Sequence, residues 1–470
     1  MKNNIYYIIF ALLLTSSIYA QSPPNFLVIL VDDLGKTDLG TYGNEFIETP
    51  NIDQLAQDGM KWVHAYSGAP VCSPSRAAFL TGKNSARVHF TGHITAIGRH
   101  RHPENSMIIP PKDLMFIPLK EVILPELVKS TGYRTISIGK WHVGPTGYWP
   151  LDMGFDENVA GWTHGSPPSH FFPYEDENKK WNPNIPTLKD GKVGEYLSDR
   201  LTDEAMSFIQ RNKNNPFLIY LPYYAVHTPL QAPEDLVKKY KDKQLTKDAN
   251  PEIDPTYAAM VDKLDQNIGR LIDKLEAEGI TENTVVIFAS DNGAEEGSSD
   301  MQHYRAGKGH LYEGGLRVPF IMKWPNHIKA NSINENRTRS EDVFATIADI
   351  VGYELDDNMN IDGVSLVSQF NGESGQEMEG ERDMFWYYPH YAPQGNSPGG
   401  SIISGDYKYI EFFDPIKNEL YNIKLDPSEQ RDLSNDMPEK IIELSGKFNK
   451  WIHDVCPILH TVNPNYTKSN

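Results

Sequence analysis

Apolar runs alternate with amphipathic segments along residues 25–350 of this 470-residue chain. The runs predict buried strands at 25–31, 133–139, 216–224 and 283–290. The segments between them predict helices, the first with Thr49 as N-cap, Pro50 as first helical residue and Gly59 as the stop. This alternation predicts an α/β fold, in which helices cover both faces of a large, mainly parallel or mixed sheet.

Polar residues stand just beyond the ends of these predicted strands. They are Asp32 and Asp33, Lys140 and His142, His227, and Asp291 and Asn292. Open α/β sheets bind ligands beyond the carboxyl ends of their strands, so we expect the four groups to converge on one site. Taken singly, each has a plainer interpretation as a helix cap, a turn or a structural histidine.

The acidic residues among them favour a hard cation. Three carboxylates and one amide oxygen, without thiolate or imidazole, suit calcium better than zinc. Lys140 and His142 alternate along the end of a strand, which predicts that both point the same way. Lys308 lies in a glycine-flanked loop whose backbone can approach a ligand closely, and a flexible surface loop is the alternative.

The first twenty residues predict an export signal. Met1 and Lys2 precede an apolar run, and small residues lead to a cleavage site after Ala20. The run is too short to span a bilayer, so we expect export without a membrane anchor. The formal net charge of -19 argues against nucleic acid as the main partner.

The chain has two cysteines, Cys72 and Cys456. In an exported protein, a disulfide between them is one interpretation. Cys72 lies in CSPSRAAFLTG, however, where turn-forming residues and Arg76 surround it, and this favours a chemical role. We then expect Cys456 to be a small buried apolar residue.

These motifs resemble those of the type I sulfatases, in the alkaline-phosphatase-like superfamily. The resemblance runs from NFLVILVDDLG through CSPSRAAFLTG, GKWHVG, HTPL, SDNG and KGHLYEGGLRVP to LYNIKLDPSEQRDL. It implies that a maturation enzyme oxidises Cys72 to Cα-formylglycine, whose hydrate attacks sulfur and then expels sulfate. It also implies a signal peptide at 1–20, a catalytic domain at 21–381, and a C-terminal α+β subdomain at 382–470 with an antiparallel sheet and a packed helix.

The resemblance also implies a role for each site residue. One Ca²⁺ is expected to bind Asp32, Asp33, Asp291, Asn292 and the modified Cys72, and to act as Lewis acid. Arg76 and Lys140 are expected to hold the formylglycine and neutralise charge. His227 and Lys308 would donate to the leaving oxygen, and His142 would be the base that releases sulfate.

A sulfated carbohydrate is the expected substrate, because an exported sulfatase without a membrane-embedding segment meets extracellular glycans. Two segments offer candidate contacts with it. Residues 87–104 contribute His93, Arg99, His100 and Arg101, and the aromatic-rich residues 161–184 contribute His164 and His170. A solvated surface loop is the alternative for the first segment, and Trp162 or Trp181 in the second is a candidate for stacking on a sugar.

Two other functions stay open. A phosphatase or phosphodiesterase of the same superfamily would use Ser or Thr and two zinc ions, which need further His ligands, whereas Asn292 follows Asp291 here. A non-catalytic glycan-binding homologue would lack Cys72 or an acidic ligand, and neither is missing.

Overall fold

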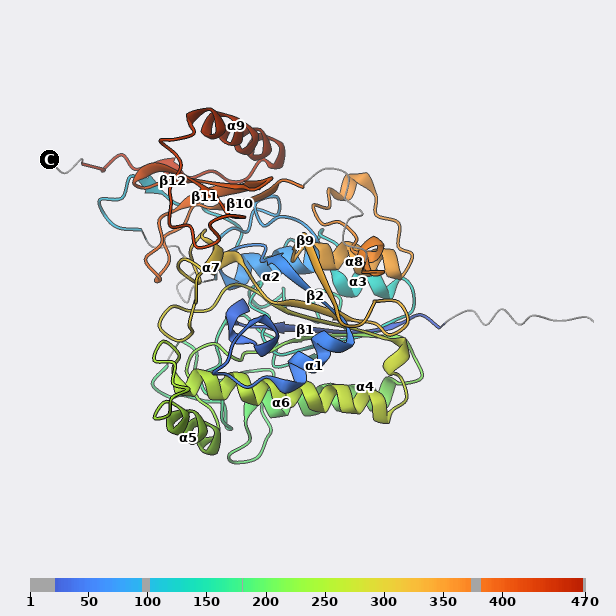
Figure 1. Ribbon diagram of the computed structural model, residues 1–470. Coiled ribbons are helices and arrows are strands. Elements are labelled where there is room, and N and C mark those ends of the chain that lie inside the picture. The colour runs from blue at the N-terminus through green and yellow to red at the C-terminus, as the bar shows by residue number, and fades with distance from the viewer. Residues whose placement is uncertain (1–21, 95–101, 180, 373–381, 468–470) are drawn as a thin grey trace, which may run out of the picture.

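The computed structural model describes residues 22–94, 102–179, 181–372 and 382–467 (Figure 1). The predicted signal peptide at 1–20 lies outside the described residues, as do Arg99, His100 and Arg101. In the part of the chain that is described, no helix has both the length and the apolar character needed to cross a membrane.

An eight-stranded sheet forms the centre of the molecule, in the order β5-β4-β6-β1-β7-β8-β2-β9. Its strands are β1 (Asn25–Val31), β2 (Met60–Tyr66), β4 (Arg134–Ile138), β5 (Glu157–Val159), β6 (Phe217–Pro222), β7 (Thr284–Ser290), β8 (Phe320–Lys323) and β9 (Ser332–Arg339). Neighbouring strands are parallel except at β8, which runs antiparallel to β7 and β2. The predicted mixed α/β sheet is therefore confirmed.

Helices cover both faces of this sheet (Figure 1). On one face lie α1 (Pro50–Asp58), α4 (Leu197–Asn212), α5 (Glu234–Lys243) and α6 (Pro255–Ala277), and on the other lie α2 (Cys72–Thr81), α3 (Leu124–Lys129) and α8 (Asp342–Ile350). Alternate residues of β1 enter the two layers, with Leu27 in one core and Val28 in the other. Burial on both faces explains why this strand is apolar throughout.

A separate antiparallel sheet follows near the C-terminus, in the order β10-β11-β12-β13. It consists of β10 (Met384–Tyr388), β11 (Gly399–Ser404), β12 (Tyr407–Phe413) and β13 (Ile416–Asn422). One face packs on α9 (Pro438–Val455), and the other packs on Tyr66 and Leu316 of the larger unit. Besides short 3-10 helices, the described residues also contain β3 (Ile108–Ile109), α7 (Glu313–Leu316) and β14 (Thr461–Val462). The division between residues 381 and 382 stays a prediction.

The CSPSR segment forms the start of α2, and a helix accepts proline in its first turn. Two local expectations were wrong. Strand β4 ends at Ile138, and positive φ angles at Gly139 (117°) and His142 (58°) break the expected alternation. Cys456 is exposed where α9 ends, and both thiols are free, so no disulfide forms.

Candidate active site

The site is built at the carboxyl ends of β1 and its two neighbours, β6 and β7. The backbone N–H of Asp32 donates to the carbonyl of Ala225 (3.0 Å), and that of Asp291 donates to the carbonyl of Val31 (3.1 Å). Asp33 has a φ of 60°, and its Oδ1 accepts a hydrogen bond from Asn292 Nδ2 at 2.8 Å. Parallel pairing thus brings together acidic residues that are far apart in the sequence.

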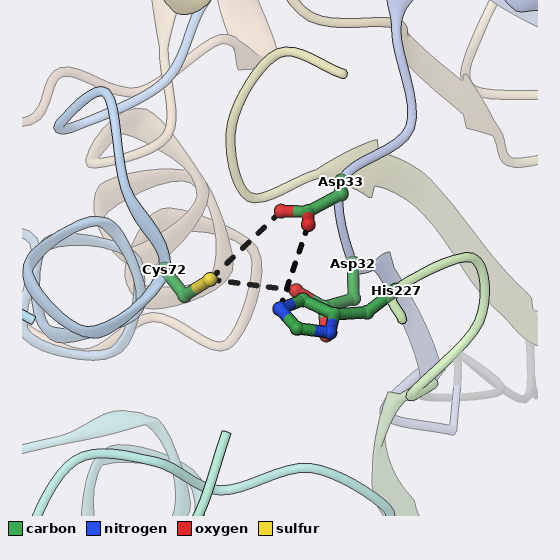
Figure 2. A group of neighbouring side chains, drawn as sticks. All are labelled: Asp32, Asp33, Cys72 and His227. Carbon is green, nitrogen blue, oxygen red and sulfur yellow. Dashed lines mark hydrogen bonds and ion pairs between the residues drawn. The ribbon is translucent and has the colours of Figure 1, made fainter. Parts of the chain in front are cut away.

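Cys72 is the first residue of α2, and its side chain points toward the two aspartates of β1 (Figure 2). Its Sγ lies 3.6 Å from Asp32 Oδ1 and 3.9 Å from Asp33 Oδ1. Burial raises the pKa of this thiol to about 12, although Lys140 and Lys308 oppose the shift. Because the thiolate is the reactive form, an unmodified Cys72 would be a weak nucleophile at neutral pH.

Arg76, one turn further along α2, links three of the loops at the site. Its Nε donates to Asp291 Oδ2 at 2.8 Å, and its Nη1 donates to the carbonyl of Lys140 at 2.9 Å. Its Nη2 lies 3.7 Å from Asp32 Oδ1. The side chain is fully buried, so its planar fork holds these groups in fixed positions.

Two buried lysines supply further positive charge. Lys140 Nζ donates to both oxygens of Asp32, each at 2.7 Å. Lys308 Nζ donates to Asp33 Oδ2 at 2.6 Å. With Arg76, these residues set three cations against three carboxylates in a largely buried site.

The pKa values show how crowded the carboxylates are. Burial raises the pKa of Asp32, and it raises the pKa of Asp291 to about 6. Burial acts in the same direction on Asp33, but Lys308 and His227 help to outweigh it, and the pKa of Asp33 falls below its ordinary value. Positive charge is therefore needed here to keep the group of acids ionised.

The donor set fits a hard cation. Ligand atoms of Asp32, Asp33, Cys72 and His227 all lie within 4.8 Å of one another (Figure 2). The amide oxygen of Asn292 is buried and accepts no hydrogen bond from the described residues, which a role as metal ligand would explain. Carboxylate and amide oxygens are the ligands that Ca²⁺ prefers. His227 was not a predicted ligand, and it adds a nitrogen at the edge of the set.

His227 faces the carboxylates from the loop after β6. Its Nε2 lies 3.6 Å from Asp33 Oδ2, and its Nδ1 lies 2.8 Å from the carbonyl of Thr228. A carbonyl only accepts, so Nδ1 carries the proton. Burial, and then Lys308, lower the pKa of His227 to about 3, so the ring is neutral. His170, unlike His227, is fully buried, and its Nε2 lies 3.1 Å from the His227 carbonyl, which makes it a support for His227 rather than a substrate contact.

Lys308 is the charged member of the two predicted proton donors. Burial opposes its charge, but Asp33 outweighs burial, and the pKa of Lys308 lies well above its ordinary value. At neutral pH the ammonium group is therefore present beside Cys72 and Asp33, whereas the His227 ring is uncharged.

His142 has a free ring nitrogen, as a base requires. Its Nε2 lies 3.1 Å from the carbonyl of Ile94, so Nε2 carries the proton and Nδ1 has a lone pair. Within the described residues, Nδ1 is buried and has no hydrogen-bond partner. Burial, and then Lys140, lower the pKa of this imidazole. Its ring packs directly over Gly165, where any Cβ would overlap it.

Glycines in the Lys308 loop serve backbone packing. A Cβ at Gly293 would overlap the carbonyl oxygen of Gly314, and a Cβ at Gly314 would overlap that of Ala306. These glycines allow the Lys308 loop to lie against the end of β7. This packing places Lys308 at the site. That the glycines flanking Lys308 let the backbone approach a ligand stays a prediction.

Two of the predicted substrate contacts, His93 and His164, remain to be placed. His93 is partly buried and near enough to His142 to affect its pKa. His164 lies edge-on between Trp162 (ring centroids 4.5 Å apart) and Trp181 (5.5 Å). Trp162 is a core residue, whereas Trp181 is 52% exposed and so is the better candidate for stacking on a sugar.

Sequence reasoning missed two residues next to Lys308. Glu295 Oε2 lies 3.8 Å from Lys308 Nζ, and Gln394 Nε2 donates to both carboxylate oxygens of Glu295 at 3.1 Å. Glu295 follows the SDNG motif closely, so the strand-end argument could have included it. No local signal marks Gln394, because only the packing of the second sheet brings it here.

In this site the strand ends of a large α/β sheet bring carboxylates and cations around Cys72, the first residue of α2. This arrangement is that of an alkaline-phosphatase-like hydrolase. The chain belongs to the sulfatase family, whose model matches residues 24–353. A second model, for the C-terminal part of N-sulphoglucosamine sulphohydrolase, matches residues 302–454. The protein is therefore a sulfuric ester hydrolase.

Individual relatives agree with this family. A sulfatase of Formosa agariphila is 31% identical, over 92% of this chain and 89% of its own. The N-acetylgalactosamine-6-sulfatase of Mus musculus is 35% identical, over 78% of this chain and 69% of its own. The crystal structure of Ps i-CgsB in complex with k-i-k-neocarrahexaose is 28% identical, with a TM-score of 0.75 over 92% of this chain and 93% of its own.

Proposed function

We propose that the protein is an exported sulfatase that removes sulfate from a glycan, using formylglycine formed from Cys72 and one Ca²⁺. The position of Cys72 carries the proposal, since it lies in the CSPSR motif and within 3.9 Å of Asp32 and Asp33. One relative is named an N-acetylgalactosamine-6-sulfatase and another holds a neocarrahexaose, which supports a glycan as substrate. The apolar N-terminal run supports export.

The modified cysteine and the ion each supply one kind of chemistry. As its hydrate, formylglycine supplies a hydroxyl that attacks sulfur and a second one that expels sulfate, while Ca²⁺ supplies Lewis acidity toward the sulfate oxygens. Asp32, Asp33, Asp291 and Asn292 would hold the ion together with the modified side chain.

The protein's other groups handle charge and protons. Arg76 and Lys140 hold the strand ends and offset the negative charge of the sulfate. Lys308 would give a proton to the leaving oxygen, because its ammonium group is charged at neutral pH, whereas the ring of His227 is neutral and faces Asp33. The lone pair on His142 Nδ1 can accept a proton when sulfate is released.

The first test is the chemical state of Cys72. Mass spectrometry of protein co-produced with a formylglycine-generating enzyme should show an aldehyde in the Cys72 peptide and an unchanged thiol in the Cys456 peptide. Activity toward an aryl sulfate should follow the aldehyde fraction. Full activity in protein that carries only the Cys72 thiol would refute the formylglycine proposal.

The second test concerns the metal. Calcium at 100 times its dissociation constant should stabilise the folded state by about 2.7 kcal/mol, which appears as a rise in melting temperature. Asp33→Asn should lose most of this rise, while Asp248→Asn, at an exposed loop position, should keep it. Two zinc ions per chain by elemental analysis would instead favour a phosphodiesterase.

The third test is the substrate. Defined sulfated oligosaccharides should release inorganic sulfate, and an ion-chromatography screen would show which sugar and position are preferred. Hydrolysis of aryl sulfates alone would contradict a glycan substrate.

A further inference from the structure

A cavity of about 300 Å³ lies between the Lys308 loop and the C-terminal sheet. Arg305, His310 and Tyr312 line it from the loop, and Phe412 and Lys417 line it from the sheet. Its volume is at the lower end of the range for small-molecule sites, about 300–1,000 Å³, so it has room for one small unit.

Residues on two walls of the cavity lie close in sequence to Lys308 and to Gln394. His310 follows Lys308 by two residues, and two residues span at most about 7 Å. The opposite wall includes Asn396, which follows Gln394 closely in the chain. Gln394 is hydrogen-bonded to Glu295, and Glu295 lies 3.8 Å from Lys308 Nζ. One wall is therefore connected to Lys308 through the chain, and the other is connected to it through Gln394 and Glu295.

Arg305 is held in place on an aromatic ring. Its guanidinium carbon lies 3.9 Å from the centroid of the Tyr312 ring, and its Nη1 donates to Tyr421 Oη at 2.7 Å. The same nitrogen donates to the carbonyl of Glu429 at 3.2 Å. Stacking and hydrogen bonds orient this cation before any ligand arrives, which lowers the entropic cost of binding.

The charge in the cavity is positive overall. Among the described residues that line it, Glu419 is the one carboxylate. This group accepts hydrogen bonds from Tyr312 (2.8 Å), Tyr421 (2.7 Å) and Lys417, and its Oε2 lies 3.8 Å from Arg305 Nη1. Against it stand Arg305 and Lys417, whose side chains are 35% and 55% exposed. In a chain with a net charge of -19, two accessible cations around an engaged carboxylate favour an anionic ligand.

We propose that this cavity is a subsite for an anionic sugar unit next to the unit that loses its sulfate. Arg305 and Lys417 would bind its sulfate or carboxylate group, and Tyr312 and Phe412 would pack against its C–H face. The inference rests on the glycan function proposed above. It predicts that the enzyme prefers substrates in which the sugar next to the one that loses its sulfate also carries a negative charge.

The test uses sulfated disaccharides whose second sugar carries a sulfate, a carboxylate or no charge. Hydrogen bonds to charged groups contribute about 1.5–3 kcal/mol, so Lys417→Met should raise KM for the charged disaccharides about 10-fold or more. KM for the uncharged disaccharide should change far less, and kcat should stay the same. A larger effect with the sulfate or with the carboxylate would identify the natural group.

Lys424→Met is the matched control, because Lys424 lies just after β13, the strand that contains Lys417, and its side chain is 69% exposed. It should alter no KM value. Equal KM changes for charged and uncharged disaccharides, or none, would overturn the subsite while leaving the glycan function intact. Cleavage of aryl sulfate but of no disaccharide by the wild type would overturn the glycan function and the subsite together.

Discussion

Two buried clusters of charge in this protein have different consequences. The first is the active site around Asp32 and Asp33. The second, here called the inter-sheet cluster, comprises Glu313, Arg317, Lys408 and Glu429 and joins α7 to the C-terminal sheet. Lys408 Nζ lies 3.1 Å from Glu313 Oε1 and 2.9 Å from Glu429 Oε1, and all three residues are almost completely buried.

The inter-sheet cluster is closed. The other oxygen of Glu313 lies 3.0 Å from both Tyr66 Oη and Arg317 Nε, and the other oxygen of Glu429 accepts from the backbone N–H of Glu313 at 2.7 Å. Each carboxylate oxygen of the pair thus has a close partner. Such a cluster can hold α7 against the C-terminal sheet, and its members offset one another's charge.

The active site contains groups that the described residues leave unpaired. Asn292 Oδ1 and His142 Nδ1 are buried without hydrogen-bond partners, and Cys72 lies among carboxylates at a helix start. Buried charge alone is therefore a poor guide to catalysis. Convergence at the carboxyl ends of parallel strands separates the reactive cluster from the structural one. Unpaired atoms do not, because Arg317 Nε and Glu429 Oε1 are also buried without a hydrogen bond from the described residues.

The largest expected effect comes from Cys72→Ala. Loss of a nucleophile lowers kcat by a factor on the order of 10⁶ in well-studied hydrolases, and we expect a loss of that order here. Because little volume is removed, the melting temperature should stay close to that of the wild type. Turnover of an aryl sulfate and a thermal melt measure the two effects, with Cys456→Ala as the neutral control. Collapse of the fold in Cys72→Ala would give the active site a structural role.

Lys308→Met should separate substrates by their leaving groups. General acid catalysis contributes about 10²–10⁴-fold, and an activated aryl sulfate needs it least. We therefore expect kcat on a sugar sulfate to fall by that factor and kcat on an aryl sulfate to fall much less. Equal losses on both would mean that Lys308 only holds the nucleophile or the ion.

Lys408→Met should affect stability instead of chemistry. Removing one partner of a buried ion pair costs about 3–5 kcal/mol, because the other charge stays buried and uncompensated. Urea unfolding should show this loss, while KM of the remaining folded enzyme for an aryl sulfate should be retained. Lys424→Met, at an exposed pair, should cost less than about 1 kcal/mol. A stable Lys408→Met variant would remove the contrast between the two clusters.

The smallest effect concerns pH and the inter-sheet cluster. Burial raises the pKa of Glu429 from 4.5 to about 7, against the opposing effect of Lys408. The folded state therefore binds this proton more tightly than the unfolded chain, and the resulting stability is present below pH 4.5 and lost as pH rises through 7. We expect the free energy of unfolding to fall by about 1–3 kcal/mol between pH 5 and pH 8. Glu429→Gln should flatten this part of the urea-unfolding profile, and an unchanged slope would contradict the shifted pKa.

Local sequence patterns predicted many of the elements. The strand at Asn25–Val31 and the helix at Pro50–Asp58 have the bounds that their patterns indicate. The reason is that apolar periodicity, caps and proline positions act over a few residues. The same logic identified Asp32 and Asp291 as strand-end residues that meet.

Tertiary packing decided what depends on contacts between distant segments. Arg87 begins the segment 87–104 that we expected to offer substrate contacts, but it forms a bidentate pair with Asp362 at 2.8 and 2.7 Å. Gln394 reaches Lys308's surroundings only because the second sheet docks there, and Cys456 is exposed because α9 ends there. The sequence by itself determined which elements form and which strand ends carry chemistry. The direction of each side chain, its partners and its protonation came from the tertiary structure, because burial and charge pairing arise only when separate segments meet.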